Sequence, residues 1–222
     1  MIDKLLNSIA PHYCYNCGKI GGLLCDSCKY NIINAGFNGC VVCGLPTLRG
    51  VCNDHAYTYK SAYVVGERKD ALQYIIDDYK FQRLRSAYII LADLINQTLP
   101  ELPDDIIVTT IPTSKPHVRQ RGYDHTLLIS KRLAKLRKLQ FQKTLVHKEG
   151  VSQHFLSRAE RRIHAESAFE IDTYIRPGAN YLIIDDIFTT GSTIESASRI
   201  LNKAGANHIS IAVIARQPLS LF

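Results

Sequence analysis

Two adjacent carboxylates, Asp185 and Asp186, follow a short apolar run near the C-terminal end of the chain. This run, residues 181–184, predicts a strand that is buried on both faces, as in the centre of a parallel sheet. In an open α/β sheet, ligands bind in the crevice beyond the carboxyl ends of the strands, where these two side chains are expected. Carboxylates accept hydrogen bonds from ribose hydroxyls or hold Mg2+.

A hydroxyl-rich loop comes directly after the carboxylates and leads into a helical pattern. A loop that feeds a helix N-terminus offers free backbone N–H groups and the positive end of the helix dipole, and both suit a phosphate. The carboxylates and the loop together predict a site for a ribose 5-phosphate. The residues predicted to hold the phosphate are Ile187, Phe188, Thr189, Thr190, Gly191, Ser192 and Thr193.

A second loop is dense in cations. Residues 105–112 predict another buried strand, and the loop at 113–125 leads into a helix predicted over 126–139. If this loop lies beside the first one, it points Lys115, Arg119 and Arg121 into the same crevice. Because arginine forks match phosphate oxygens, we predict a second anion site here, suited to pyrophosphate.

Two further segments are basic. Residues 80–85 predict a solvated turn between helices expected at 70–79 and 86–99, and residues 151–169 predict a lid over a phosphorylated ligand. The predicted basic cluster, assigned to pyrophosphate or DNA, contains Lys80, Arg119, Arg121, Arg158, Arg161 and Arg162.

All seven cysteines lie before residue 53, in three Cys-x-x-Cys pairs and a fourth pair that ends in histidine. Four such pairs supply the ligands of two tetrahedral Zn2+ ions, and closed four-ligand sites serve to fold a small segment. Sequential and interleaved pairing both fit, and the short spacers favour the sequential one. The predicted ligands are Cys14, Cys17, Cys25, Cys28, Cys40, Cys43, Cys52 and His55.

The 222 residues can hold one α/β domain and a small appendage, so we expect a Cys-rich zinc module at 1–60 and an α/β domain at 61–222. That domain is expected to have a mainly parallel, twisted sheet flanked by helices. No apolar run approaches the roughly 20 residues that cross a bilayer, and the N-terminus does not resemble a signal peptide. We therefore expect a cytoplasmic protein without membrane insertion. The net charge of +7 favours an anionic partner, either a polyphosphorylated small molecule or nucleic acid.

Residues 181–193 resemble the phosphoribosyl pyrophosphate (PRPP) binding motif of type I phosphoribosyltransferases, in which four hydrophobic residues precede an acidic pair and a Thr-Thr-Gly loop. The order of the motifs extends the resemblance. A paired-cysteine module, Arg119-Gln120-Arg121-Gly122-Tyr123, the segment LSRAERR at 156–162 and the PRPP motif follow one another as in the ComF/ComFC/GntX family of competence-associated proteins. One departure is Asp124-His125, where family members more often carry Asn-Gln.

The phosphoribosyltransferase resemblance implies a similar fold and Mg2+-dependent PRPP binding. Asp185 and Asp186 would be the catalytic residues and would engage the ribose 2- and 3-hydroxyls, directly or through Mg2+. The loop at 189–193 would hold the 5-phosphate. The residues that would contact pyrophosphate are Pro112, Thr113, Ser114 and Lys115.

The competence-family resemblance implies a role in natural transformation, in which the protein handles incoming single-stranded DNA in the cytoplasm. Competence and recombination proteins are then the expected protein partners. The alternative hypothesis is an active phosphoribosyltransferase of nucleotide metabolism or salvage, whose acceptor nothing in the sequence specifies.

Overall fold

A five-stranded sheet forms the centre of the computed structural model, which describes residues 12–148 and 168–218. The strands are β1 (Ser61–Glu67), β2 (Ile107–Thr110), β3 (Gln140–Phe141), β6 (Tyr181–Phe188) and β7 (Ile209–Arg216). Their order is β1-β7-β6-β2-β3, and every neighbouring pair is parallel. The central strands β6 and β7 are nearly continuous apolar runs because both of their faces are covered. The expected α/β fold is confirmed.

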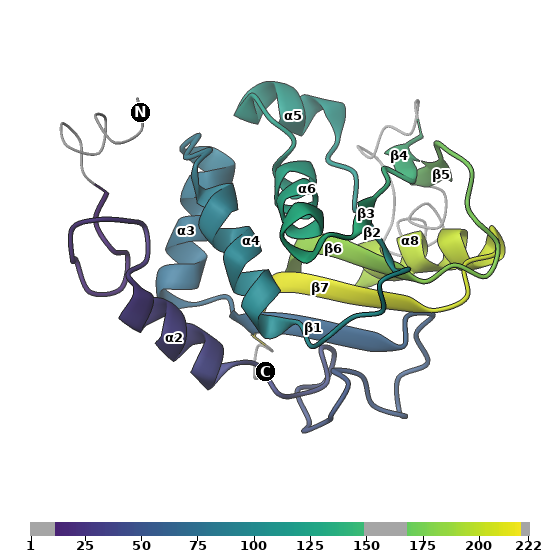
Figure 1. The fold of residues 1–222 in the computed structure, drawn as a ribbon, viewed down its shortest axis with the longest axis horizontal. Helices are drawn as coiled ribbons and strands as arrows, with labels where there is room; N and C mark the ends of the chain where they lie inside the picture. The colour runs from purple at the N-terminus through teal and green to yellow at the C-terminus, as the bar shows by residue number, and fades with distance from the viewer. Residues whose placement is uncertain (1–11, 149–167, 219–222) are drawn as a thin grey trace, which may run out of the picture.

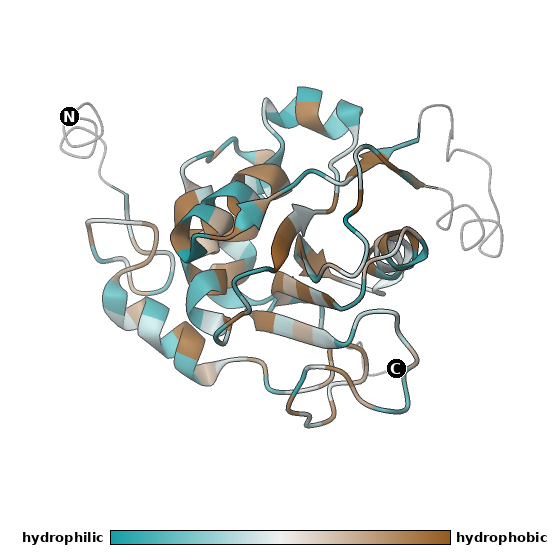
Figure 2. Ribbon diagram, turned by 45° about the vertical axis from the view of Figure 1, so that its right-hand side comes forward, coloured by the Kyte–Doolittle hydropathy of each residue, from teal (hydrophilic) through white to brown (hydrophobic). Residues whose placement is uncertain are grey.

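Two layers cover the sheet (Figure 1). Helices α3 (Asp70–Phe81), α4 (Ala87–Thr98) and α6 (His125–Arg137) share one hydrophobic core with Leu182 and Ile184 of β6. Helix α8 (Ser192–Lys203) and a small antiparallel pair, β4 (Leu145–His147) and β5 (Phe169–Ile171), share the other core with Tyr181 and Ile183. Because strand side chains alternate, successive residues from Tyr181 to Ile184 serve opposite layers. Figure 2 shows mostly apolar strands beside helices that carry both polar and apolar residues.

The cysteine-rich segment packs against the sheet and the first helical layer. Its helix, α2 (Asp26–Ala35), contacts β1 and α4, and Leu23, Leu24 and Cys28 belong to the core of the α3–α4–α6 layer. Val41 belongs to the opposite core, which α8 covers. The segment therefore contributes to both layers of the fold.

Two local expectations were wrong. The strand predicted at 181–184 continues through both carboxylates to Phe188, so the carboxylates lie within β6 and not after it. The segment predicted as a loop at 113–125 contains a helix, α5 (Lys115–Arg121). Pro116 fits its first turn, where proline removes no helical hydrogen bond, and Gly122 ends it in the left-handed conformation with φ of 82°.

None of the described helices combines the length and hydropathy that a membrane crossing requires.

Candidate ribose-phosphate and metal sites

Asp185 and Asp186 point to opposite faces of the sheet because they are neighbours in one strand. Asp186 follows the pattern of Ile184 and faces the α3–α4–α6 layer, where its side chain is buried. Asp185 follows Ile183 and faces the α8 layer, where it remains partly exposed. The two carboxylates of one motif therefore meet different surroundings.

Asp186 is held by two side chains from the helical layer. Lys80 Nζ of α3 lies 2.8 Å from its Oδ2, and His125 Nε2 at the start of α6 bonds the same oxygen. Burial alone would raise the pKa of this carboxyl, but the hydrogen bond from His125 and the charge of Lys80 outweigh burial, so the pKa lies well below its ordinary value. Asp186 is thus a charged anchor at which α3, α6 and β6 meet.

His125 also contacts a buried arginine, Arg121. The Arg121 NH1 group lies 2.8 Å from His125 Nδ1, and a guanidinium nitrogen can only donate a hydrogen bond. Nδ1 is therefore the acceptor, and Nε2–H donates to Asp186. Arg121 thus lies behind His125, which differs from the expectation that it points into the open crevice.

Asp185 has a different environment. Its Oδ1 accepts a hydrogen bond of 2.9 Å from the backbone N–H of Asp186. Desolvation, followed by the nearby charge of Asp186, raises the pKa of Asp185 from 3.8 to about 8. A hydroxyl that donates to this carboxylate, or a divalent cation, would stabilise its charged form. This carboxylate is chemically suited to a ligand.

The loop at 189–193 connects β6 to α8 in a tight turn. Gly191 has φ of 74°, and a Cβ at this position would lie 2.4 Å from Cζ of Phe188, so a side chain there would be strained and would clash. No side chain caps the N-terminus of α8, and Thr189, Thr190, Ser192 and Thr193 are exposed. Buried Phe188 lies against Gly191 of the loop, whereas half-buried Ile187 packs against the core of the α3–α4–α6 layer. The loop presents hydroxyls and the start of a helix to solvent.

The predicted pyrophosphate loop is fixed from both sides. Thr113 Oγ1 donates to Asp124 Oδ1 at 2.8 Å, and His147 Nε2 donates to the carbonyl of Pro112 at 2.9 Å. Ser114 is the N-cap residue of α5, while Lys115 and Arg119 are exposed on that helix. Arg158, Arg161 and Arg162 lie outside the described residues, as does most of the predicted lid.

Sequence reasoning missed the structural importance of Asp124 and His125, which were noted only as a departure from the family pattern. Asp124 caps α6 by accepting from the N–H of Leu127. An Asp before a helical pattern is a capping signal that predicts this role. The contact between His125 and Asp186 spans 61 residues and has no local signal.

The metal ligands form two groups in sequence order. The first contains Cys14, Cys17, Cys25 and Cys28, and the second contains Cys40, Cys43, Cys52 and His55. Within each group the ligand atoms all lie within 4.8 Å of one another, so the structure supports the sequential pairing. Burial would raise the pKa of Cys14, but backbone N–H donors lower it to about 6, which favours the thiolate that a metal needs. Two clusters that can hold metal ions are therefore present.

The second cluster is connected to the phosphate loop. The N–H and Oγ1 of Thr58, three residues after His55, donate to the Glu195 carboxylate at 2.9 and 2.8 Å. Glu195 lies in the first turn of α8. Buried Arg216, at the end of β7, donates to the carbonyls of Val41 and Val42 between two of the cluster's cysteines.

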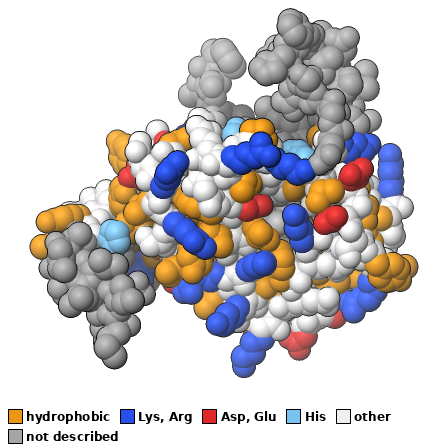
Figure 3. Space-filling view, turned by 90° about the horizontal axis from the view of Figure 1, so that it is seen from above, with side chains coloured by type: hydrophobic (Ala, Val, Ile, Leu, Met, Phe, Trp, Pro, Cys, Tyr) orange, Lys and Arg blue, Asp and Glu red, His pale blue; other side chains and the backbone are white. Residues whose placement is uncertain are grey.

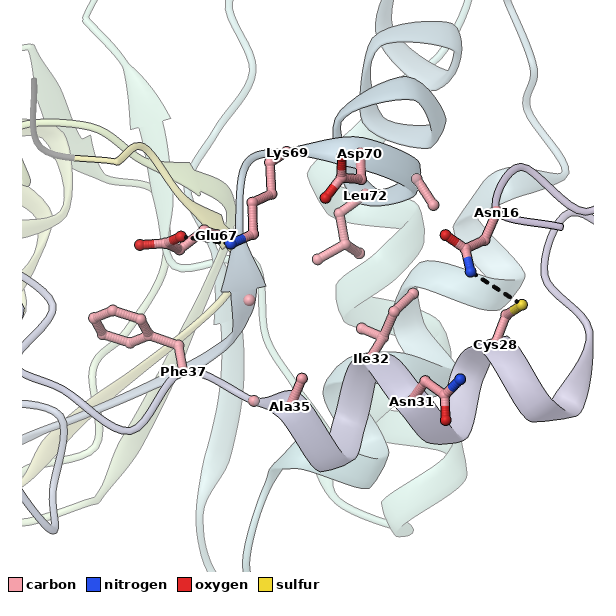
Figure 4. Close-up of a pocket in the computed structure, with 13 residues that line it drawn as sticks. Asn16, Cys28, Asn31, Ile32, Ala35, Phe37, Glu67, Lys69, Asp70 and Leu72 are labelled. Atoms are coloured by element: carbon pink, nitrogen blue, oxygen red, sulfur yellow. Dashed lines mark hydrogen bonds and ion pairs between the residues drawn. The ribbon is translucent and has the colours of Figure 1, made fainter.

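A separate pocket of about 440 Å³ lies between α2 and the start of α3 (Figure 4). No residue of the predicted ribose-phosphate site lines it. Glu67 and Asp70 are on its wall, and Lys69, which also lines it, pairs with Glu67 at 3.0 Å. This acidic wall does not suit a phosphate.

Comparisons with known proteins match part of the chain to a described domain. Residues 132–221 match the family model of the phosphoribosyl transferase domain. Among solved structures, an adenine phosphoribosyltransferase is 21% identical, with a TM-score of 0.40 over 61% of this chain and 73% of that one.

Proteins that match most of the chain are named for competence or for DNA utilization. Competence protein F of Haemophilus influenzae is 27% identical over 87% of this chain and 90% of that protein. The DNA utilization protein YhgH of Escherichia coli O157:H7 is 26% identical over 80% of this chain and 83% of that protein. Competence protein ComFC of Streptococcus pneumoniae is 24% identical over 87% of each. These matches confirm the resemblance to the ComF/ComFC/GntX family.

Proposed function

We propose that this protein acts in natural transformation, where it handles incoming single-stranded DNA in the cytoplasm and binds PRPP with Mg2+ beyond the end of β6. Similarity to proteins named for competence and DNA utilization, over most of the chain, carries the biological part of the proposal. Competence and recombination proteins are its proposed partners. The proposal covers PRPP binding and does not require turnover.

The chemical part rests on one edge of the sheet. Asp185 lies four residues before the start of a loop that presents four hydroxyl side chains and the uncapped start of α8. The ribose hydroxyls would donate to the Asp185 carboxylate, and the 5-phosphate would accept from the loop. Lys115 and the Pro112–Ser114 backbone, at the end of the neighbouring β2, would receive pyrophosphate. Mg2+ would neutralise charge on the pyrophosphate.

The two cysteine clusters would hold structural Zn2+. The donor sets, four thiolates in one and three thiolates with an imidazole in the other, match closed zinc sites. We propose the division into a zinc module at 1–60 and a phosphoribosyltransferase-like domain at 61–222 on this basis. Metal analysis of the purified chain should give two zinc ions per molecule, and one or none would contradict the proposal.

Calorimetric titration with PRPP and Mg2+ tests the ligand. Wild type should bind, and Asp185→Asn should lose at least ten-fold in affinity because the amide cannot replace the carboxylate toward hydroxyls or Mg2+. Adding Asp186→Asn should abolish binding. Normal PRPP binding by the double variant would exclude this site.

A transformation assay tests the biology. A strain that lacks the gene should transform poorly, and the wild-type gene should restore it. An unchanged transformation frequency in the deletion strain would contradict the competence role. The proposed ligand site is tested separately, by the calorimetric titration.

A further inference from the structure

The turn between α3 and α4 forms a continuous surface with α5. Arg83 NH2 of the turn bonds the carbonyl of Gln120 in α5 at 3.4 Å, and the Arg121 guanidinium carbon lies 5.9 Å from the centre of the Phe81 ring. We call this the α3–α5 surface and define it by Phe81, Arg83, Arg85 and Arg119. The sequence predicted a solvated turn at 80–85 and assigned only Lys80 of this segment to the basic cluster, so the neighbouring α5 adds a new observation.

The surface carries unneutralised positive charge. Arg83, Arg85 and Arg119 are exposed, and within the described residues none of them forms an ion pair with a carboxylate. Arg83 has φ of 56°, a left-handed conformation that a long side chain adopts at a steric penalty. Glycine or asparagine would serve the turn better, so the backbone does not explain an arginine here. Figure 3, which looks onto the side of the molecule that carries α5, shows Lys and Arg side chains spread across it.

Phe81 is an aromatic ring exposed among these cations. Its side chain is 61% exposed, which leaves a large part of the ring in contact with solvent. An exposed ring beside arginines matches the arrangement that proteins use for unpaired bases, in which the ring stacks on a base while cations contact the phosphates. Duplex DNA hides its base faces, so this combination selects a single strand.

The α3–α5 surface adjoins the ribose-phosphate site. Lys80, the residue before Phe81, forms the ion pair with Asp186, and Arg121 of α5 bonds His125. A strand bound on this surface would therefore lie next to the crevice beyond β6.

We propose that the α3–α5 surface binds single-stranded DNA, with phosphates on Arg83, Arg85 and Arg119 and one base stacked on Phe81. This inference rests on the proposed handling of single-stranded DNA and assigns that activity to a surface. It requires no metal and no bound PRPP.

The test is fluorescence anisotropy of a labelled 20-nucleotide oligo(dT) with the full-length protein over a series of salt concentrations. Replacing Arg83 and Arg85 by glutamine removes two phosphate contacts, so the slope of log affinity against log salt should become shallower by about 1.4. The matched control is Lys60→Gln with Lys203→Gln, two exposed lysines, of which the first precedes the edge strand β1 and the second ends α8 on the other face of the sheet. This control removes the same charge and should leave the slope near the wild-type value.

A second variant tests stacking. Phe81→Ala should weaken oligo(dT) binding by roughly 5- to 150-fold with little change in slope, since loss of one stacked base has this effect. Tyr74→Ala, which removes another exposed aromatic ring from α3, should have no such effect. Equal effects of the two aromatic variants would overturn the role of Phe81.

The outcomes separate this inference from the proposed function. If wild type does not bind oligo(dT) at low salt, the proposed DNA handling fails and the surface fails with it. If wild type binds but Arg83→Gln/Arg85→Gln keeps the wild-type slope and affinity, the surface assignment is wrong and the proposed function stands. The PRPP titration of this variant should match wild type, which also shows that the variant is folded.

Discussion

The two faces of the sheet at the end of β6 treat neighbouring carboxylates in opposite ways. On the face covered by α3, α4 and α6, Asp186 is buried, its pKa is lowered, and Lys80 and His125 bond one of its oxygens. On the face covered by α8, Asp185 is partly exposed, its pKa is raised, and its hydrogen-bond partner among the described residues is a backbone N–H. We propose that the two carboxylates have different roles, with Asp186 joining the layers and Asp185 facing a ligand.

The physical reason lies in the requirements of a buried charge. A carboxylate removed from water must be paired and hydrogen-bonded, and Asp186 obtains both from elements that are distant in sequence. A carboxylate meant for a ligand needs unused acceptor capacity, which Asp185 retains.

The largest expected effect is on folding. Asp186→Asn should lower the free energy of unfolding by about 3 kcal/mol, because Lys80 is left as a largely buried, unpaired charge. Asp185→Asn makes the same chemical change one residue away and should not destabilise the protein. Urea denaturation of both variants measures the difference. Equal losses of stability in the two variants would contradict the difference between the two faces of the sheet.

A smaller effect on stability is expected when the unpaired Lys80 is replaced as well. In Asp186→Asn, the additional change Lys80→Met should recover about 1–2 kcal/mol of the lost stability, because it removes the unpaired charge. A double variant that is less stable than Asp186→Asn alone would show that Lys80 does not depend on Asp186.

The pH dependence of stability should differ between the faces. Asp185 has a folded-state pKa of about 8 against 3.8, so between about pH 4 and 8 the folded chain holds a proton that the unfolded chain releases. Stability from this group is therefore lost as pH rises through that range. The lowered pKa of Asp186 acts in the opposite sense, with stability present above about pH 4 and lost below it.

Denaturation at several pH values without added divalent cations measures this dependence. The stability difference between Asp185→Asn and wild type should grow in favour of the variant from pH 5 to pH 8. A difference that stays constant over this range would contradict the raised pKa of Asp185.

The smallest expected effect concerns the connection between the second cysteine cluster and the phosphate loop. Cys52→Ser should speed amide hydrogen exchange at 189–195 by an amount equivalent to about 1 kcal/mol, because the Thr58–Glu195 hydrogen bonds would be loosened. Cys17→Ser alters the first cluster in the same way and should leave this segment near wild-type exchange. Equal changes in the two variants would show that the clusters do not differ in their influence on the loop.

Much of the site could be predicted from local sequence. The apolar run before Asp185 and the hydroxyl-rich loop after it are contiguous signals, and the Cys-x-x-Cys pairs carry their own geometry. Strand β6 is longer than predicted because its pairing with β7 continues to Phe188. A hydrophobic pattern ends at the first carboxylate, so it cannot predict that Asp186 lies inside the strand with a buried partner.

The rest depended on long-range contacts. Nothing near Arg121 in the sequence indicates that this cation is buried behind a histidine, because arginines in polar segments are usually exposed. The pairing of Lys80 with Asp186 joins residues more than 100 positions apart and follows only from the strand order. The helix α5 did have local signals, Pro116 and Gly122, which the cationic character of the segment obscured.

A crystal structure of the protein with PRPP and Mg2+ tests the central claim most directly. The account predicts the 5-phosphate against the backbone of the 189–193 loop, a ribose hydroxyl or Mg2+ at Asp185, and Asp186 still bonded to Lys80 and His125. PRPP bound at another place, or Asp186 released from both partners to bind the ribose while Asp185 makes no contact, would contradict it.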